Sequence, residues 1–164
     1  MKFYRLKQFY WNLHSRLDEY DLKFINNILS EDELELFKKL SMSEQKHCVK
    51  VAYDVEKTCY KKDINLNIIL KAALLHDIGK IYRRLTIIDK SIMVLLNSIT
   101  LGKMKYMCKF NKINVYYNHA KIGAKLLEKI SCNKYVIFLV KNHDNNDIND
   151  NKYLNIIKYC DNNN

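Results

Sequence analysis

The chain contains no proline and only three glycines in 164 residues. Tight turns depend on these two residues, because proline fixes φ and glycine reaches backbone conformations closed to other residues. Sandwiches and barrels need many such turns, whereas helices joined by polar loops need few. The sequence therefore predicts an all-α fold. Its length suits a single domain built around one hydrophobic core.

The charge balance points towards an anionic partner. The chain has 28 Lys and Arg against 18 Asp and Glu, a formal net charge of +10. Such a balance favours nucleotides, nucleic acid or acidic lipid. A solvated lysine-rich surface explains the same balance, and the lysines are spread along the chain rather than gathered in one basic patch. The net charge by itself leaves both interpretations open.

Cysteine usage and hydropathy indicate the cellular compartment to expect. The five cysteines are odd in number and form no C-x-x-C pair, which indicates reduced thiols and a cytoplasmic setting. No run of 18 apolar residues occurs, and the beginning of the sequence lacks the pattern of a signal peptide. We therefore expect no membrane partner. The cysteines are Cys48, Cys59, Cys108, Cys132 and Cys160.

The capping motif Ser-x-x-Glu occurs twice, beginning at Ser30 and at Ser41. In this motif the serine side chain accepts a hydrogen bond from the backbone N–H of the third helical residue, and the side chain of the glutamate at that position accepts one from the serine N–H. The first motif predicts a short helix through Leu40. The second predicts a longer helix to about Tyr60.

Hydrophobic spacing predicts the remaining helices. The apolar segment 66–77 indicates a buried helix that ends near Gly79, which is expected to be its C-cap. Residues 134–142 suit a strand or a helix, and a helix is preferred because no partner strands are evident. The stretch 101–113 fits neither pattern. The other expected helices are 3–17, 89–99, 117–130 and 151–160.

Histidines and aspartates carry the candidate chemistry. Imidazole and carboxylate are the usual ligands of divalent metals of intermediate hardness. Neighbours in a regular helix diverge, but at a helix end both members of a His-Asp pair can reach one ion. The ion would neutralise a carboxylate that is otherwise costly to bury. Taken singly, each residue is more often an ordinary surface or core residue. The candidates are His47, the pair His76-Asp77, His119, His143 and, after the last expected helix, Asp161.

The order and spacing of these residues resemble the HD superfamily of metal-dependent phosphohydrolases. The segment LLHDIGK at 74–80 looks like the HDIG variant of the family motif. NHAKIGAKLLEKI, VKNHD and IIKYCD, at 118–130, 140–144 and 156–161, resemble three further family segments. The resemblance covers residues 41–164. We accordingly expect an HD domain at 41–164, a single-domain helical bundle, preceded by an N-terminal helical extension at 1–40.

The resemblance implies a set of metal ligands. It assigns the first divalent ion to His47, His76, Asp77 and Asp161, and it matches His119 and His143 to positions that bind a second ion, with Asp77 bridging. Asn142 stands where the first histidine of a family pair commonly lies, and the Gly-Tyr-Pro segment of cyclic-di-GMP phosphodiesterases is missing. One ion is therefore expected and a second is left open. Fe, Mn, Mg, Co, Ni and Zn all suit such ligands.

The activity implied is hydrolysis of a phosphate ester or anhydride, as a phosphomonoesterase or phosphodiesterase, by metal-activated water. Asp77 would hold the ion and orient the water. Lys80 matches a lysine that contacts substrate phosphate, a role suited to its point charge. Arg83 and Arg84 could extend the anionic site, although such arginines are more often surface residues. The expected partner is a small phosphorylated substrate, foremost a nucleotide.

Two alternatives remain at this point. The first is a catalytically silent regulatory HD module that binds a nucleotide without turning it over. The second is a nucleic-acid-binding protein, because basic and aromatic side chains alternate near the start of the chain and could contact phosphates and stack on bases. Packing of this amphipathic segment on the domain is preferred over nucleic-acid binding. The residues concerned are Lys2, Tyr4, Arg5, Lys7, Phe9, Tyr10, Trp11 and Arg16.

Overall fold

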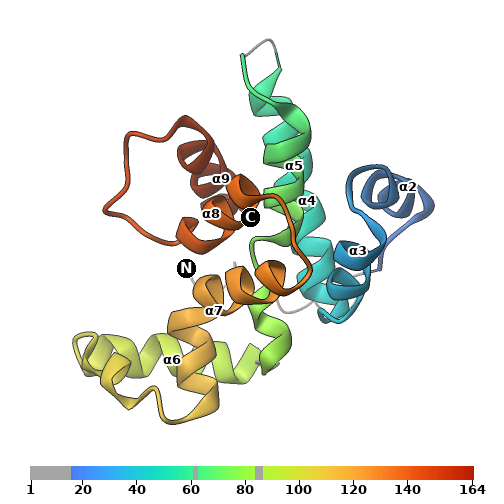
Figure 1. Ribbon diagram of the computed structural model, residues 1–164. Coiled ribbons are helices and arrows are strands. Elements are labelled where there is room, and N and C mark those ends of the chain that lie inside the picture. Colours follow the sequence, from blue (N-terminus) through green and yellow to red (C-terminus); the bar gives the residue numbers. More distant parts are fainter. Residues whose placement is uncertain (1–15, 61–62, 84–86) are drawn as a thin grey trace.

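The computed structural model describes residues 16–60, 63–83 and 87–164, and these residues form only helices and loops (Figure 1). The predicted all-α class is confirmed. The helix expected over 3–17 lies outside the described residues except for Arg16 and Leu17, which are not helical. The helices are α2 Glu19–Ile28, α3 Glu31–Lys38, α4 Met42–Cys59, α5 Leu66–Leu75, η1 Ile78–Tyr82, α6 Ile87–Ile99, η2 Lys103–Met107, α7 Asn111–Lys129, α8 Lys134–Asn142 and α9 Lys152–Asn162.

Both predicted capping boxes start the helices assigned to them. The Ser30 backbone N–H donates to Glu33 Oε2 at 2.8 Å, and the Glu33 N–H donates back to Ser30 Oγ at 3.5 Å. At the start of α4 the Ser41 N–H donates to Glu44 Oε2 at 3.2 Å, and the Glu44 N–H donates to Ser41 Oγ at 3.4 Å. These reciprocal bonds satisfy backbone donors that no helical carbonyl can reach.

The hydrophobic core surrounds α5, which packs against α4, α8 and α9 (Figure 1). Most of the apolar run predicted to be buried is inaccessible, from Ile69 to Asp77 except for the half-buried Lys71, whereas Leu66 at its start is exposed. Residues ahead of position 41 join the same core, because Ile25 of α2 and Phe37 of α3 are fully buried in it. The described part of the expected extension therefore packs onto the bundle, and the boundary at 40/41 stays a prediction.

Gly79 has a different role from the predicted one. Helix α5 ends at Leu75 with His76 as its C-cap, and the chain then turns into the short 3₁₀ helix η1. A Cβ on Gly79 would lie 1.9 Å from the carbonyl oxygen of His119 and 2.7 Å from the backbone nitrogen of Gly123. The glycine is therefore required by the close approach of η1 to α7, and it is not the C-cap of α5.

Three boundaries also differ from the predictions. Helix α7 begins at Asn111 rather than near 117, and η2 occupies part of the stretch 101–113. No side-chain cap bond marks the start of α7, so the sequence carried no local signal there. Helix α9 continues to Asn162, which places Asp161 in its last turn rather than after it. Among the described residues, no helix combines the length and the apolar character needed to cross a membrane.

Candidate metal centre

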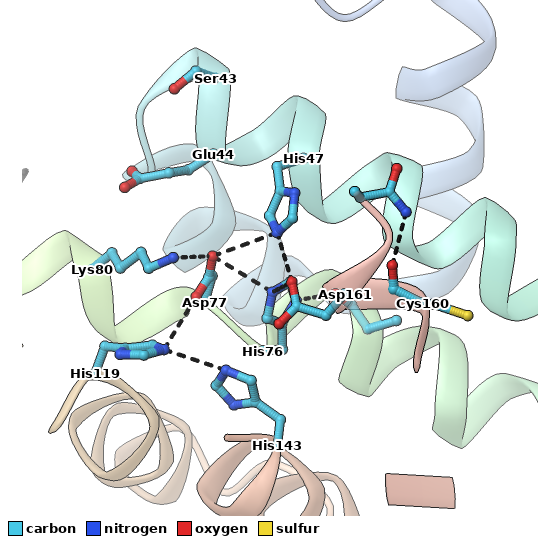
Figure 2. Close-up of polar contacts among 12 residues, drawn as sticks. Ser43, Glu44, His47, His76, Asp77, Lys80, His119, His143, Cys160 and Asp161 are labelled. Carbon is cyan, nitrogen blue, oxygen red and sulfur yellow. Dashed lines mark hydrogen bonds and ion pairs between the residues drawn. The ribbon is translucent and has the colours of Figure 1, made fainter. Parts of the chain in front are cut away.

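Five elements bring the candidate residues together (Figure 2). His47 comes from the second turn of α4, His76 and Asp77 from the break between α5 and η1, and His119 from α7. The end of α8 supplies His143, and the last turn of α9 supplies Asp161. Every metal ligand implied by the sequence thus lies in one cluster.

The first half of the cluster is built on His47, His76 and Asp161. His47 Nε2 lies 2.9 Å from Asp161 Oδ1, and His76 Nε2 lies 3.5 Å from the same oxygen. Asp77 Oδ2 completes the group at 3.5 Å from His76 Nε2 and 3.9 Å from His47 Nε2. One potential ligand atom from each of His47, His76 and Asp161 falls within 4.8 Å of the others, close enough to share one cation.

The second half is built on the other oxygen of the same aspartate. His119 Nε2 lies 3.4 Å from Asp77 Oδ1 and 3.3 Å from His143 Nε2. These three residues likewise offer one ligand atom each within 4.8 Å. Asp77 is buried between the two groups, with Oδ2 facing the first and Oδ1 facing the second (Figure 2). This is the geometry of a carboxylate able to bridge two positions.

Backbone hydrogen bonds determine which ring nitrogens face the centre. His76 Nδ1 lies 2.8 Å from the carbonyl oxygen of Ala73, and His143 Nδ1 lies 2.8 Å from that of Val140. Since a carbonyl only accepts, each Nδ1 must carry its proton. In the neutral imidazoles Nε2 then presents a lone pair to the cluster, and carbonyl bonds of this kind orient metal-binding histidines.

The Nε2 atom of His76 provides the test of whether a metal fits. It is buried and has no hydrogen-bond partner among the described residues, although carboxylate oxygens of Asp77 and Asp161 both lie 3.5 Å away. A lone pair facing two carboxylates is repulsive, so a positive charge, either a proton on Nε2 or a metal cation, must lie between them. The mixed imidazole and carboxylate donors therefore fit a divalent metal of intermediate hardness.

The electrostatics keep the carboxylates charged. Burial alone would raise the pKa of Asp77, but Lys80, His76 and His119 hold it well below its ordinary value. Burial likewise opposes the charge on Asp161, and its contacts with His47 and His76 keep its pKa low. Ionised oxygens are the form that binds metal.

The histidines divide into two kinds. Burial would lower the pKa of His76, but Asp77 and Asp161 hold it well above its ordinary value. Burial and the neighbouring imidazoles lower the pKa of His143 to about 3, and burial also lowers that of His119. His119 and His143 are therefore neutral, as ligands must be, while at His76 a proton and a metal ion compete.

Lys80 lies beside Asp77 and contacts its Oδ2 (Figure 2). Burial would lower the pKa of Lys80, but Asp77, followed by Glu44, raises it, so the ammonium group stays charged. Arg83 lies exposed just after η1, and its role in substrate binding stays a prediction. Arg84, expected to bind substrate, lies outside the described residues, as do the basic and aromatic residues before Arg16.

Two residues near the centre were not identified from the sequence. Cys48 is fully buried and could form a cation-binding group with His76 and Asp77, but burial raises the pKa of its thiol and favours the neutral form. Glu44 lies near Lys80 from the first turn of α4 (Figure 2). In the sequence, Glu44 was interpreted only as part of the capping motif that begins at Ser41, so its position near the centre was not predicted.

Asn142 is the last residue of α8, directly before His143. Its Nδ2 donates to the carbonyl oxygen of Phe138 at 2.8 Å, a bond within its own helix α8. The second half of the cluster is therefore built from His119, His143 and Asp77 alone among the described residues.

Comparison with protein families and with known proteins gives one match. The family model described as HD domain matches residues 45–162, which is more than half of the chain. The matched range begins just before His47 and ends just after Asp161, so it includes every residue of the cluster. Curated proteins and solved structures gave no significant match.

Proposed function

Because the chain belongs to the HD domain family, whose members are generally metal-dependent phosphohydrolases, we propose that it hydrolyses a phosphate ester or anhydride of a small substrate, foremost a nucleotide. The observation that carries this proposal is the buried Nε2 atom of His76, which faces carboxylate oxygens of Asp77 and Asp161 at 3.5 Å and is repelled by them unless a proton or a metal ion lies between. A bound divalent cation removes that conflict, and it also supplies the chemistry that phosphate hydrolysis needs.

Two groups of residues would hold metal. His47, His76, Asp161 and Asp77 Oδ2 suit a first ion, and Asp77 Oδ1 with His119 and His143 suits a second. When bound, the metal would acidify a water molecule and polarise a phosphoryl oxygen. A single ion in the first group is the minimal form of the proposal, and occupancy of the second group would make Asp77 the bridge.

The side chains around this position have separate tasks. Asp77, held ionised by Lys80 and the histidines, accepts a hydrogen bond from the attacking water and so orients it towards the phosphorus atom. The Lys80 ammonium group, already charged and fixed by Asp77, offsets negative charge on the phosphoryl oxygens. Because both side chains are largely buried, their electrostatic effect is larger than it would be in water.

The direct test compares Asp77→Asn with Asp54→Asn. The first change removes the central carboxylate charge with little change in shape, and the second removes a carboxylate paired with Lys57 on the surface of α4. We expect Asp77→Asn to lose bound metal and to lower hydrolysis by roughly 100-fold or more, while Asp54→Asn retains both. Elemental analysis of the freshly purified protein identifies the metal for a panel of nucleotides and generic phosphodiesters.

Two results would contradict the proposal. If Asp77→Asn keeps the metal content of the unmodified chain, the assignment of the centre fails. If the metal-loaded protein binds nucleotides saturably but releases no product with any divalent metal of the panel, the chain is a regulatory nucleotide-binding module instead.

A further inference from the structure

The lysines are spread along the whole sequence, but the acidic residues are not. Between Asp89 and Glu128 there is no acidic residue, while the same stretch contains seven lysines. It includes most of α6, all of η2 and most of α7. In this part of the second half of the chain the only fully charged side chains are therefore cationic, and the metal centre does not account for these lysines.

Part of this stretch forms a structural unit of its own, which we call the α6–η2 lobe and define as residues 87–110. In Figure 1 the lobe lies at the lower left, away from the α4–α5 pair. It packs on the first turns of α7 around a small separate cluster made by Met93, Met104 and Ile113. Helix α6 contributes only one side, through Met93, to this cluster.

The other side of α6 is apolar and exposed. Ile92, Leu95, Leu96 and Ile99 follow the i, i+3, i+4, i+7 spacing of a single helical stripe, and all four are exposed, Ile99 by 69%. No charged residue occurs from Ser91 to Gly102. A monomeric protein rarely presents a continuous apolar stripe of this kind to water unless something binds there.

The turn after α6 extends the stripe to the tip of the lobe. The Gly102 N–H donates to the carbonyl oxygen of Asn97 at 2.9 Å and the Leu101 N–H to that of Ser98 at 3.3 Å, the two bonds of a Schellman helix end. Such ends place their αL residue at the position held here by Leu101, with φ 48°. Leucine is unfavourable in this conformation, and its side chain is 87% exposed.

Lysines and further apolar side chains alternate beyond the turn. Tyr106 is 79% exposed, and Met107 and Phe110 are also exposed. The ammonium group of Lys105 lies 5.4 Å from the ring centre of Tyr106, so cation and apolar surface are direct neighbours. Lys103 and Lys109 are exposed on the same segment.

We propose that the α6–η2 lobe docks on the surface of an anionic lipid bilayer, with its aliphatic and aromatic side chains in the interfacial layer and its lysines among the lipid phosphates. An apolar stripe flanked by lysines and aromatic rings is the physical requirement for such binding. The lobe would lie on the bilayer without crossing it. The proposal revises the expectation of no membrane partner, which was based on spanning segments, and it does not depend on the proposed hydrolytic activity.

The composition of the lobe favours lipid over two other occupants. Nucleic acid would also neutralise the lysines, but Ile92, Leu95 and Leu101 have no ring to stack on bases. A second copy of the chain would cover the stripe, but it would bring together two lysine-rich lobes whose single acid, Asp89, is already paired with Lys112, and their like charges would repel. An anionic surface with an apolar interior matches both the charge and the aliphatic side chains.

The experiment is flotation of the full-length chain with vesicles. We expect the protein to bind vesicles of mixed phosphatidylglycerol and phosphatidylcholine, to bind vesicles of phosphatidylcholine alone much more weakly, and to dissociate as salt rises. Leu101→Gly should lower the partition coefficient roughly tenfold, because one buried leucine is lost. It should not lower the unfolding temperature, since glycine suits the αL backbone better than leucine does.

Matched variants separate the lobe from general charge and hydrophobicity. Reversing Lys103, Lys105 and Lys109 together to Glu should abolish binding, at about fivefold per lysine, whereas reversing Lys23, Lys38 and Lys134 should weaken it far less. Tyr159→Ser, at an exposed position of α9, controls for Leu101→Gly. The proposal is overturned if the wild-type chain does not float with the anionic vesicles, or if the two triple-lysine variants bind equally well. It is also overturned if light scattering shows a dimer that Leu101→Gly dissociates. Finally, RNA binding that depends on the lobe, with vesicle binding that does not, would overturn it.

Discussion

At Gly79 the backbone of η1 runs so close to α7 that no side chain fits. A methyl group would lie 1.9 Å from the carbonyl oxygen of His119, which belongs to the rigid backbone of α7. We expect Gly79→Ala to lower the free energy of unfolding by about 2–3 kcal/mol and to weaken metal binding, since η1 carries Asp77 and α7 carries His119. Urea denaturation and metal analysis measure the two effects.

Gly102→Ala is the control for this substitution. Gly102 has φ 79° and open space around it, so alanine there meets backbone strain but no clash with α7. It should cost about 1 kcal/mol and leave the metal content unchanged. Equal metal loss in both variants would show that the close approach at Gly79 has no particular importance for the centre.

In the proposed mechanism the task of Lys80 is purely electrostatic. Lys80→Met keeps the length of the side chain and removes the charge beside Asp77. We expect kcat to fall roughly 100-fold while the metal stays bound, because the ligand set is untouched. Arg83→Met, at the exposed end of η1, should have a much smaller effect. Full activity of Lys80→Met would remove the lysine from the proposed mechanism.

At the scale of the element, α4 shows how a local motif supports a distant site. The Ser41 side chain caps this helix, and His47 lies on its second turn. We expect Ser41→Ala to destabilise the protein by about 1 kcal/mol through the lost cap. Ser91→Ala, at an exposed position of α6, should change stability by less than about 0.5 kcal/mol. Thermal unfolding of both variants makes the comparison, and equal midpoints would argue against the cap.

The helices also differ in how completely they are covered. Helix α5 is covered by protein from Ile69 onwards, and the side chains there are apolar except for Lys71. Helix α6 is similarly apolar, but it packs on one side only. Apolar side chains are thus buried in one helix and form an exposed stripe in the other, and this difference motivates the membrane-docking proposal.

At the scale of the whole molecule, stability should depend on buried ion pairs away from the metal centre. Glu33 lies 2.7 Å from Lys71 and accepts a hydrogen bond from Cys132 at 3.1 Å, which ties α3 to α5 and to the loop after α7. Burial alone would raise the pKa of Glu33, but Lys71 and the Ser30 N–H hold it below its ordinary value of 4.5.

This shift gives a stability prediction with a definite sign. A carboxyl group with a lowered folded-state pKa contributes its full stabilisation above the unfolded pKa and loses it as pH falls through the folded value. We expect Glu33→Gln to cost about 3 kcal/mol at neutral pH, because Lys71 is left without its partner, and progressively less as the solution is acidified below pH 4.5. Urea denaturation across this pH range measures the difference in unfolding free energy between the unmodified chain and Glu33→Gln. A difference that does not change with pH would contradict the prediction.

Metal should contribute to the stability of the whole fold, because the proposed ligands come from α4, α7, α8, α9 and the α5–η1 junction. On the proposed function, chelation by EDTA lowers the unfolding temperature and readdition of the metal restores it, with a stabilisation of about 2.7 kcal/mol when free metal is 100 times its Kd. Asp77→Asn should show no response to EDTA. An unchanged midpoint in the wild-type chain would mean that no metal is bound.

The sequence by itself determined the features that depend on neighbouring residues. The absence of proline and scarcity of glycine predicted the helical class, and both Ser-x-x-Glu motifs located real helix starts. The order of His47, His76-Asp77 and Asp161 predicted a family that the domain match confirms. Local hydrogen bonds and motif spacing are encoded within short stretches of chain, so they can be recognised without a fold.

Tertiary structure decided what depends on residues far apart in the chain. Gly79 could be understood only once α7 lay against it, and the contact of His76 with Asp161 joins the end of α5 to the last turn of α9. The exposure of the apolar stripe on α6 could not be predicted from the sequence either, because a hydrophobic pattern does not indicate which apolar face is covered. Packing between distant segments determines burial, and burial determines both the charge state of a carboxylate and the availability of a surface.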